Sequence, residues 1–366
     1  MNYVLSQLCE QVMTARANYK SIEIVGGHSK SFYGNQSVSD DEVFRLEMSA
    51  LSGVVSYEPS ELVLTAMAGT PLSQIEATLA ENDQMLAFDP PCFGPNSTIG
   101  GVVASGLSGP LSFGYGPLRH YVLGTHLLDA QGRILKFGGE VMKNVAGYDV
   151  SRLLTGSLGM FGAIVQVSLK VLPRPLCDVT QAFELTQQDA LALCENLKAR
   201  PIPVKAAAWL PADDQSELGQ LSIRLCGAQA AVSSAVTGLG GDSLGADEAK
   251  QWWDAFRDQK AAFFNQTPLW RLAVRARTPQ LAADHSAFDL GGQVRWLVTQ
   301  DEAQVVRDVA AGAGGHATLF RALADQVPGD GVFQPLAPSA RAIVKRLKQE
   351  LDPKSIFNPG RLVAGI

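Results

Sequence analysis

A turn of glycine, hydroxyl and basic side chains is the stretch of this chain best suited to hold an anion. Residues 26–34 read GGHSKSFYG and follow Ser21–Val25, whose alternating pattern predicts a short strand. Backbone N–H groups in such a turn can bind phosphate oxygens, and Ser29, Lys30 and Ser31 can add side-chain donors. The turn lacks the G-x-G-x-x-G spacing of a Rossmann unit. It predicts a diphosphate-binding turn, with a plain surface turn as the alternative.

A long uncharged run, residues 90–118, is the second stretch that suggests ligand binding. It contains seven glycines and five prolines, too many for a membrane-spanning helix. The glycine density continues downstream, because 15 of the 35 glycines fall between Gly94 and Gly162. Glycine lets the main chain approach a ligand closely. The run is interpreted as part of the wall around an extended anionic cofactor, and a loop-rich β domain is the alternative.

Composition limits the classes of protein that this chain can belong to. A length of 366 residues is enough for two domains, and a net charge of −6 without a basic stripe makes nucleic acid an unexpected partner. The five cysteines stand singly, which argues for a reducing compartment and against a zinc or iron–sulfur site in this chain. No metal site is expected. The first 15 residues lack Lys and Arg, so no secretory signal and a cytoplasmic location are expected.

The elements that must position these stretches can be read from hydrophobic periodicity. Residues 2–17 predict a helix; residues 44–49, 53–57 and 61–68 predict strands. A helix should follow with Thr70 as its cap, Pro71 at its first position and a buried stripe of Leu72, Ile75 and Leu79. Further expected elements are a strand at 85–88, a hairpin of 121–129 with 133–137, a short helix capped by Asp149, and a strand at 163–172.

The second half of the chain has a different texture. Strands at 179–185, 204–210 and 221–226 alternate with helices at 188–199 and 228–236, which predicts an α+β unit of ferredoxin-like style. A helix at 252–264 carries aromatic residues that are expected in the core of this unit or at a subunit contact. Strands are expected at 269–275 and 293–299. The chain closes with a helix at 339–351 and the polar segment DPKSIFNPGRL, residues 352–362, which must pack on something to be ordered.

Taken together, five segments resemble one flavoprotein superfamily. They are GGHSKSFYG, PNSTIGGVVASGLSGPLSFGYG, VLGTHLLDAQGRILKFGG, KNVAGYDVSRLLTGSLGMFGAIVQVSLKVLPRP and the closing FNPGRL. Their order is similar to that of the vanillyl-alcohol oxidase / p-cresol methylhydroxylase (PCMH-type) FAD-binding superfamily. Within it, the chain length and the KNVAGYD phrase resemble the FAD-binding E subunits of bacterial glycolate oxidase (glycolate dehydrogenase).

The resemblance implies an α+β fold in three parts. Residues 1–175 would form a PCMH-type FAD-binding domain of two α+β subdomains, and residues 176–335 a ferredoxin-like α+β cap for substrate or subunit contact. Residues 336–366 would return to the flavin site. It also implies non-covalent FAD, although the G-G-H turn at His28 leaves covalent attachment as an alternative.

Carried over by position, the resemblance implies a set of cofactor-binding residues. The diphosphate would lie between the 26–34 turn and the 98–101 segment, the flavin near 105–109, and the ribose and adenine near Gly159, Gly162 and Ile164. The set comprises Gly26, Gly27, His28, Ser29, Lys30, Gly34, Pro90, Thr98, Ile99, Gly100, Gly101, Ser105, Gly106, Gly109, Gly159, Gly162, Ile164 and Asn358.

Catalytic residues are less defined by the sequence. Arg119 could clamp a carboxylate, or form a surface ion pair; Tyr148 and Lys143 could contact flavin or substrate, or pack a loop. Arg361 could lie near the flavin. The histidine and metal constellation of catalytic 2-hydroxy-acid dehydrogenase subunits of this superfamily is not evident in the cap.

The activity that the resemblance implies is oxidation of glycolate, or a similar small 2-hydroxy acid, to glyoxylate. Electrons would pass to a partner iron–sulfur subunit, in a complex that also contains a related flavin subunit. Through these partners the chain could reach the inner face of a membrane. The alternatives are a non-catalytic structural or electron-relay flavoprotein subunit, and a stand-alone flavin oxidase of another alcohol or D-lactate.

Overall fold

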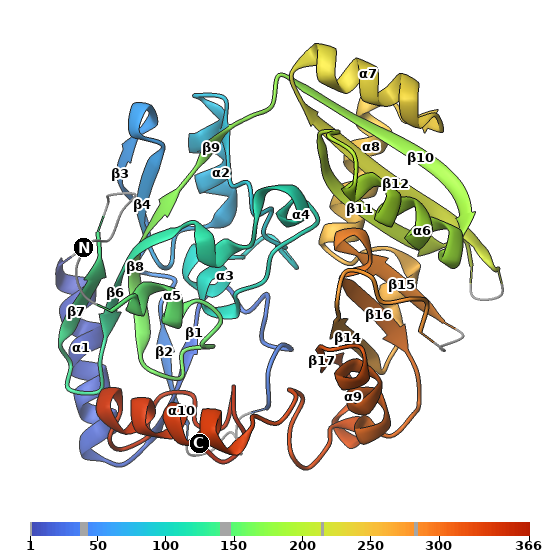
Figure 1. Cartoon of the computed structure of the whole chain (residues 1–366). Helices are drawn as coiled ribbons and strands as arrows, with labels where there is room; N and C mark the ends of the chain where they lie inside the picture. The colour runs from blue at the N-terminus through green and yellow to red at the C-terminus, as the bar shows by residue number, and fades with distance from the viewer. Residues whose placement is uncertain (1, 37–42, 140–147, 214–215, 282–284) are drawn as a thin grey trace.

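The computed structural model describes residues 2–36, 43–139, 148–213, 216–281 and 285–366, and its elements form three groups along the chain (Figure 1). The N-terminal region contains α1 (Asn2–Ala17), β1 (Ser21–Val25), β2 (Val43–Glu47), β3 (Val54–Glu58), β4 (Val63–Met67), α2 (Leu72–Ala80), β5 (Gln84–Met85), α3 (Ile99–Ser105), α4 (Ser112–Tyr115), β6 (Val122–Leu128), β7 (Ile134–Gly138), α5 (Val150–Leu154), β8 (Ala163–Lys170) and β9 (Leu172–Pro173). The cap region contains β10 (Cys177–Thr186), α6 (Gln187–Lys198), β11 (Val204–Pro211), β12 (Leu218–Gly227), α7 (Gln229–Leu239), β13 (Asp242–Ser243), α8 (Ala246–Arg257), β14 (Leu269–Ala273), β15 (Ser286–Asp289), β16 (Val294–Val298), α9 (Ala303–Gly312) and β17 (His316–Arg321). The C-terminal segment begins with α10 (Pro338–Leu351), and short 3-10 helices lie at η2 (Pro59–Glu61), η3 (Leu118–His120), η4 (Ala262–Asn265), η5 (Leu290–Gly292) and η6 (Ala324–Gln326).

The N-terminal region is built on a five-stranded antiparallel sheet in the order β3-β4-β8-β6-β7. Helix α2 buries Leu72, Ile75 and Leu79 against this sheet, and α3 adds Val102 and Val103 to the same core. Burial of these apolar side chains supplies the main stabilisation of the layer. Strand β4 is buried along its whole length, and α3 packs against β4 and β8.

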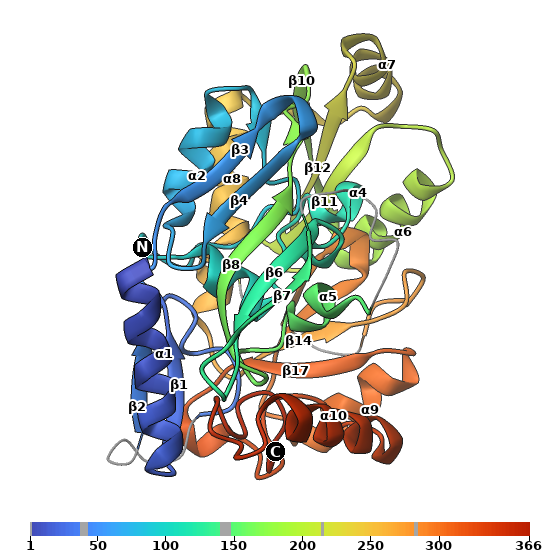
Figure 2. The same cartoon turned by 90° about the vertical axis from the view of Figure 1, so that its left-hand side faces the viewer.

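A second, smaller layer joins the two ends of the chain. Strands β1 and β2 pair in parallel, and Ile22 of β1 bridges Phe357 of the C-terminal segment in parallel as well. Helix α1 packs against this layer, with Leu8 and Val12 buried beside Ile356 and Phe357. Figure 2 shows α1, β1 and α10 together at the lower end of the N-terminal region.

The cap region forms an eight-stranded sheet in the order β13-β10-β12-β11-β15-β16-β14-β17, in which every pairing is antiparallel. Helices α6 and α7 pack on the β10–β12–β11 part and α9 on β17 (Figure 1). The chain passes from one sheet to the other between β9 and β10. The boundaries at residues 175 and 335 as limits of independent domains stay a prediction.

Most elements expected from the periodicity are present, and the α+β fold class is confirmed. Asp149 caps α5 as expected, accepting a hydrogen bond from Arg152 N. Thr70 as the cap of α2 is wrong: its hydroxyl donates to Met67 O, 2.7 Å away, and Pro71 takes the cap position. The helix expected at 252–264 is instead α8, which starts earlier and ends at Arg257, followed by η4.

The uncharged run is more regular than a bare loop. Residues 99–105 form α3, because Val102 and Val103 find a buried place under the sheet and Gly106 ends the helix with a left-handed conformation at φ 68°. The strand expected at 85–88 shortens to β5, residues 84–85. Lys143 and most of the KNVAGY loop lie outside the described residues.

Candidate functional site

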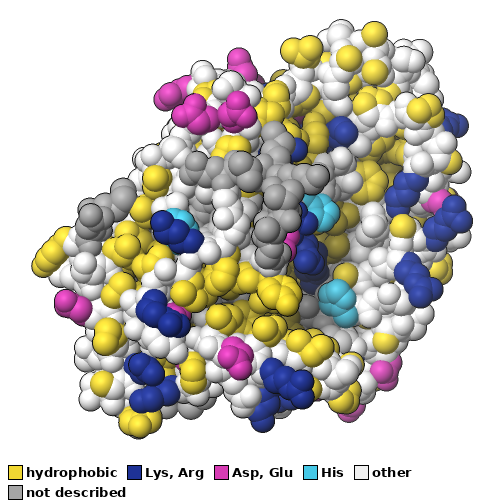
Figure 3. All heavy atoms as spheres, turned by 60° about the vertical axis from the view of Figure 1, so that its left-hand side comes forward, with side chains coloured by type: hydrophobic (Ala, Val, Ile, Leu, Met, Phe, Trp, Pro, Cys, Tyr) yellow, Lys and Arg dark blue, Asp and Glu magenta, His cyan; other side chains and the backbone are white. Residues whose placement is uncertain are grey.

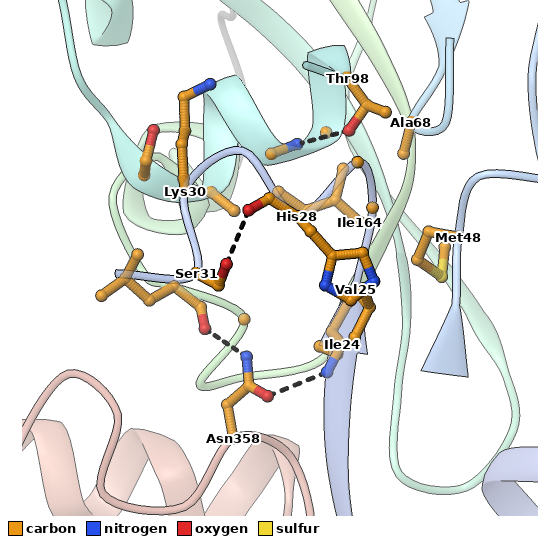
Figure 4. A pocket seen from close by; sticks show the side chains of 18 of the residues that line it. Ile24, Val25, His28, Lys30, Ser31, Met48, Ala68, Thr98, Ile164 and Asn358 are labelled. Carbon is orange, nitrogen blue, oxygen red and sulfur yellow. Dashed lines mark hydrogen bonds between the residues drawn. The ribbon is translucent and has the colours of Figure 1, made fainter. Parts of the chain in front are cut away.

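A cleft of about 860 Å³ opens between the turn after β1, helix α3 and the C-terminal segment (Figure 4). Fourteen of the residues predicted from sequence line it: Gly26, Gly27, His28, Ser29, Lys30, Thr98, Gly100, Gly101, Ser105, Gly159, Gly162, Ile164, Asn358 and Arg361. The structure thus brings together segments more than 330 residues apart in sequence.

The turn after β1 presents unused backbone donors to this cleft. None of the hydrogen bonds found among the described residues uses the amide N–H of Gly27, His28, Ser29 or Lys30. Ser31 stabilises the turn by donating both its N–H and its hydroxyl to the carbonyl of His28. His28 itself has φ 55°, a left-handed conformation. Consecutive free N–H groups in a tight turn form an anion-binding nest.

The α3 side of the cleft contributes shape more than donors. The amide of Ile99 donates to Thr70 O, that of Gly100 to Ala68 O, and that of Gly101 to Thr98 Oγ1. The backbone donors expected from residues 99–101 are therefore already occupied by the protein. This wall can contact a ligand closely because its glycines have no side chains.

Two glycines show how closely the walls approach one another. A Cβ on Gly27 would lie 1.4 Å from the carbonyl oxygen of Asn96, and one on Gly159 would lie 2.7 Å from Asn358 Nδ2. Gly159 also has φ 73°. At these positions glycine is needed for main-chain packing around the cleft, and any side chain would push its walls apart.

Asn358 fixes the C-terminal segment at the cleft. Its Oδ1 accepts a hydrogen bond from Ile24 N at 3.0 Å, and its Nδ2 donates to Leu158 O at 2.6 Å (Figure 4). Arg361 donates to the carbonyls of Ser31 and Tyr33, and burial lowers the pKa of its guanidinium. Both side chains therefore bind neighbouring protein segments, Asn358 as a clamp between β1 and the loop after α5.

The side chains of the turn differ in their surroundings. Lys30 Nζ donates to Ser97 Oγ at 2.8 Å and lies 5.7 Å from the centre of the Phe93 ring. Burial lowers the pKa of Lys30 to about 8. In Figure 4 the ring of His28 extends toward Val25 and Ile24, away from the Lys30 side chain.

The remaining predicted residues lie outside the cleft. Gly34, Pro90, Ile99, Gly106 and Gly109 do not line it, although Gly109 lines a second cavity between the two regions. Tyr148 is 93% exposed and Arg119 lies exposed in η3, so neither contacts the cleft.

Ser31, which the sequence analysis named as a possible donor of the turn, also lines the cleft. Seven lining residues were not anticipated from the sequence, and most come from strand ends: Glu23, Ile24, Val25, Met48, Ala68, Ala104 and Leu158. Their one available signal was position, directly before or after the segments already singled out. Met48 and Ala68 each follow a strand that the periodicity had identified.

The remaining observations concern the side chains on one face of the molecule, possible metal ligands and membrane spans. On the face drawn in Figure 3, hydrophobic side chains gather in the middle, acidic side chains cluster at the upper left, and Lys and Arg side chains are spread along the left, the lower edge and the right. Among the described residues, no three His, Cys, Asp or Glu side chains lie together as metal ligands. None of the described helices is long and apolar enough to span a bilayer.

Comparison with known proteins decides the family. A family model described as an FAD binding domain matches residues 5–138. The chain is 39% identical, over 98% of its length and 97% of that protein, to the glycolate oxidase subunit GlcE of Escherichia coli K12. The chain belongs to the GlcE family. It is therefore an FAD-dependent oxidoreductase subunit with an FAD-binding domain of the PCMH type.

More distant relatives share only a part of the chain. The mitochondrial D-lactate dehydrogenase [cytochrome] 1 of Saccharomyces cerevisiae is 27% identical over 44% of this chain, and the match spans 27% of that protein.

A crystal structure of alkyldihydroxyacetonephosphate synthase superposes with a TM-score of 0.67, covering 97% of this chain and 75% of that one. At 16% identity this likeness shows the fold alone.

The residues present in the cleft fit FAD. The nest of free amides at 27–30 suits a diphosphate, and the glycine walls leave room where a Cβ would fill the space. The residues that would hold the cofactor are thus those of the turn, the α3 wall, Gly159 and Asn358, although individual cofactor contacts stay a prediction.

Proposed function

We propose that this chain is the FAD-binding subunit of a complex that oxidises glycolate, or a closely similar small 2-hydroxy acid, to glyoxylate. The observation that carries the proposal is the end-to-end similarity to GlcE of E. coli, which covers the cap region as well as the FAD-binding domain. Because cap residues line the second cavity, where they face the N-terminal region, similarity in the cap bears on a bound substrate as well as on the cofactor.

The bound FAD would accept the hydride from the 2-hydroxy acid. The protein's own residues bind and orient the reactants. The nest at residues 27–30 compensates the diphosphate charge with dipoles, and Asn358 holds β1 in place.

Electrons would leave toward a partner iron–sulfur subunit, and a related flavin subunit would complete the complex. The proposal places the chain in the cytoplasm, where its five free cysteines would stay reduced. Contact with the inner face of the membrane would come through partner subunits.

Anaerobic titration of the purified chain with glycolate, D-lactate and L-lactate, followed by flavin absorbance, tests the proposal. Bleaching of the flavin by glycolate supports it. Bleaching by glycolate only after the partner subunits are added would favour an electron-relay role. Peroxide production in air with another alcohol, without partners and without a response to glycolate, would favour a stand-alone oxidase.

A further inference from the structure

A second cavity, of about 340 Å³, lies between the N-terminal region and the cap. Leu107, Ser108 and Gly109 line it from one side, and Arg271, Asp289 and Trp296 from the other. It adjoins the cofactor cleft, because Ala104 and Ser105 at the end of α3 line the cleft and Leu107 lines the cavity. A small molecule in this cavity would therefore lie next to one end of the cleft.

Two of the residues that line the cavity each carry a buried polar atom with no hydrogen-bond partner among the described residues. These atoms are Nε1 of Trp296, whose side chain is 6% exposed, and Oε1 of Gln259, whose side chain is 7% exposed. Unpaired buried donors and acceptors cost free energy and are rare in native proteins. A ligand that satisfies both would remove this cost.

Arg271 brings a cation to the same cavity. Its guanidinium lies over the Trp296 ring, 5.9 Å from the ring centre, and it forms no hydrogen bond or ion pair in the described part of the chain. A guanidinium fork that forms no hydrogen bond to a protein carboxylate can bind a ligand carboxylate with two parallel N–H groups.

The fourth polar group is Asp289, 7% exposed, whose carboxyl accepts a hydrogen bond from Leu290 N at 2.6 Å. Burial raises the pKa of Asp289 to about 7, against the opposing charge of Arg271. Near neutral pH this carboxyl can therefore accept a hydrogen bond from a ligand hydroxyl when it is ionised, or donate one to the hydroxyl oxygen when it is protonated.

The unpaired polar groups of the cavity are two donors, Arg271 and Trp296 Nε1, and one acceptor, Gln259 Oε1. Asp289 adds a carboxyl that accepts a hydrogen bond when ionised and donates one when protonated. Two further polar residues of the wall already have partners, because Arg257 pairs with Asp89, Asp254 and Asp258, and Ser108 Oγ accepts from Leu118 N. A carboxylate only accepts hydrogen bonds, whereas a hydroxyl also donates one. We propose that this cavity binds a small 2-hydroxy carboxylate, with Arg271 and Trp296 on its carboxylate and Gln259 and Asp289 on its hydroxyl. This inference rests on the proposed function and assigns residues to its substrate.

The apolar part of the wall restricts the size of that ligand. The rings of Phe93, Phe256, Phe320 and Trp296 surround the polar groups, and Trp296 packs edge-to-face on Phe320 at 5.0 Å between ring centres. These closely packed rings favour a small acid over a long or highly charged one.

Calorimetric binding to the full FAD-loaded chain under anaerobic conditions tests the assignment. The probes are glycolate, acetate, which lacks the hydroxyl, and ethylene glycol, which lacks the carboxylate. Arg271→Met should weaken glycolate binding roughly 10- to 100-fold, as loss of a charged hydrogen-bond partner does. Trp296→Phe, which keeps the ring and loses the donor, should weaken it several-fold. Acetate should bind more weakly than glycolate to the wild-type chain, and ethylene glycol should not compete.

Arg277→Met serves as the matched control, because Arg277 is 83% exposed, pairs with Glu195 and lies outside the cavity. It should bind glycolate like the wild-type chain. Flavin absorbance and melting temperature check that each variant is folded and loaded.

Equal glycolate affinity in wild type, Arg271→Met and Trp296→Phe would overturn the assignment while leaving the proposed function standing. Failure of the wild-type chain to bind any 2-hydroxy acid would overturn the proposed function and the assignment with it.

Discussion

At the scale of single residues, the cleft depends on positions where a side chain is excluded and on positions where one side chain makes two contacts. Gly27 belongs to the first kind and Asn358 to the second. The sequence indicated both, because glycine density and the closing FNPGRL phrase stood out. It could not indicate the cavity at Arg271, since strands β14, β15 and β16 bring its polar groups together only through the folded cap sheet.

Gly27→Ala should weaken FAD binding strongly, because its Cβ would meet the Asn96 carbonyl at 1.4 Å and displace the turn that carries the free amides. We expect the affinity for FAD to fall at least roughly 10-fold, which corresponds to a loss of about 1.4 kcal/mol or more of binding free energy. Fluorescence titration of the apo-chain with FAD measures it. Gly238→Ala is the control, since that glycine lies in α7 with open space around it and should bind FAD like wild type, with slightly higher stability.

Asp289 should make the stability of the chain depend on pH in a defined direction. Its pKa rises from 3.8 to about 7 on folding because of burial, so the folded state holds a proton that the unfolded state has lost between these values. Stability therefore falls as pH rises from about 4 to about 7 and levels off above. Asp289→Asn should remove this loss, which amounts to at most roughly 4 kcal/mol.

Urea unfolding of wild type and Asp289→Asn at several pH values between 4 and 8 measures this difference. The two stability curves should diverge in favour of the variant as pH rises. Exposed Asp301 provides the control, and Asp301→Asn should follow the wild-type curve. Parallel curves for wild type and Asp289→Asn would show that the carboxyl is ionised in the folded chain throughout.

At the scale of elements, the return of α10 and the segment after it completes the cleft. Lys348, 1% exposed, donates to Met160 O, Phe357 O and the carboxylate of Asp352, and Asp352 in turn accepts from Phe357 N. This buried network holds the segment against the loop that carries Gly159. The sequence predicted that residues 352–362 must pack on something, but not that a buried lysine would do it.

Lys348→Met should destabilise the chain by about 3–5 kcal/mol, because it leaves the buried Asp352 carboxylate without its charge partner. It should also lower FAD affinity, since Asn358 loses its fixed position. Chemical unfolding and FAD titration measure the two effects. Lys345→Met, on the exposed side of the same helix, should change stability by less than about 0.5 kcal/mol.

At the scale of the whole molecule, the two regions share a hydrophobic core at their boundary. Leu107 and Leu111 of the N-terminal region are buried with Trp253, Phe256 and Phe264 of the cap, so the aromatic helix is cap core as expected. Asp258 of the cap accepts a hydrogen bond from Cys92 N at 2.9 Å across the same boundary. The cavity that adjoins the cleft exists only because both regions contribute to it.

The fold could be predicted at this scale because five separate segments kept their order along the chain. The regular periodicity of β1, α2, β6, β7 and β8 also places the elements of the N-terminal region correctly. The occupied amides of Ile99 and Gly100 could not be predicted, because their partners, Thr70 O and Ala68 O, lie just after strand β4 and only tertiary packing brings them close.

We expect the cleft between the turn after β1 and the C-terminal segment to hold one FAD. The most direct test is the ratio of FAD to protein in the purified full-length chain, measured by absorbance before and after acid precipitation. One FAD per chain should be found, and acid should release it into the supernatant. It should be absent from Gly27→Ala but not from Gly238→Ala. A folded wild-type chain that is colourless and takes up no added FAD would contradict it.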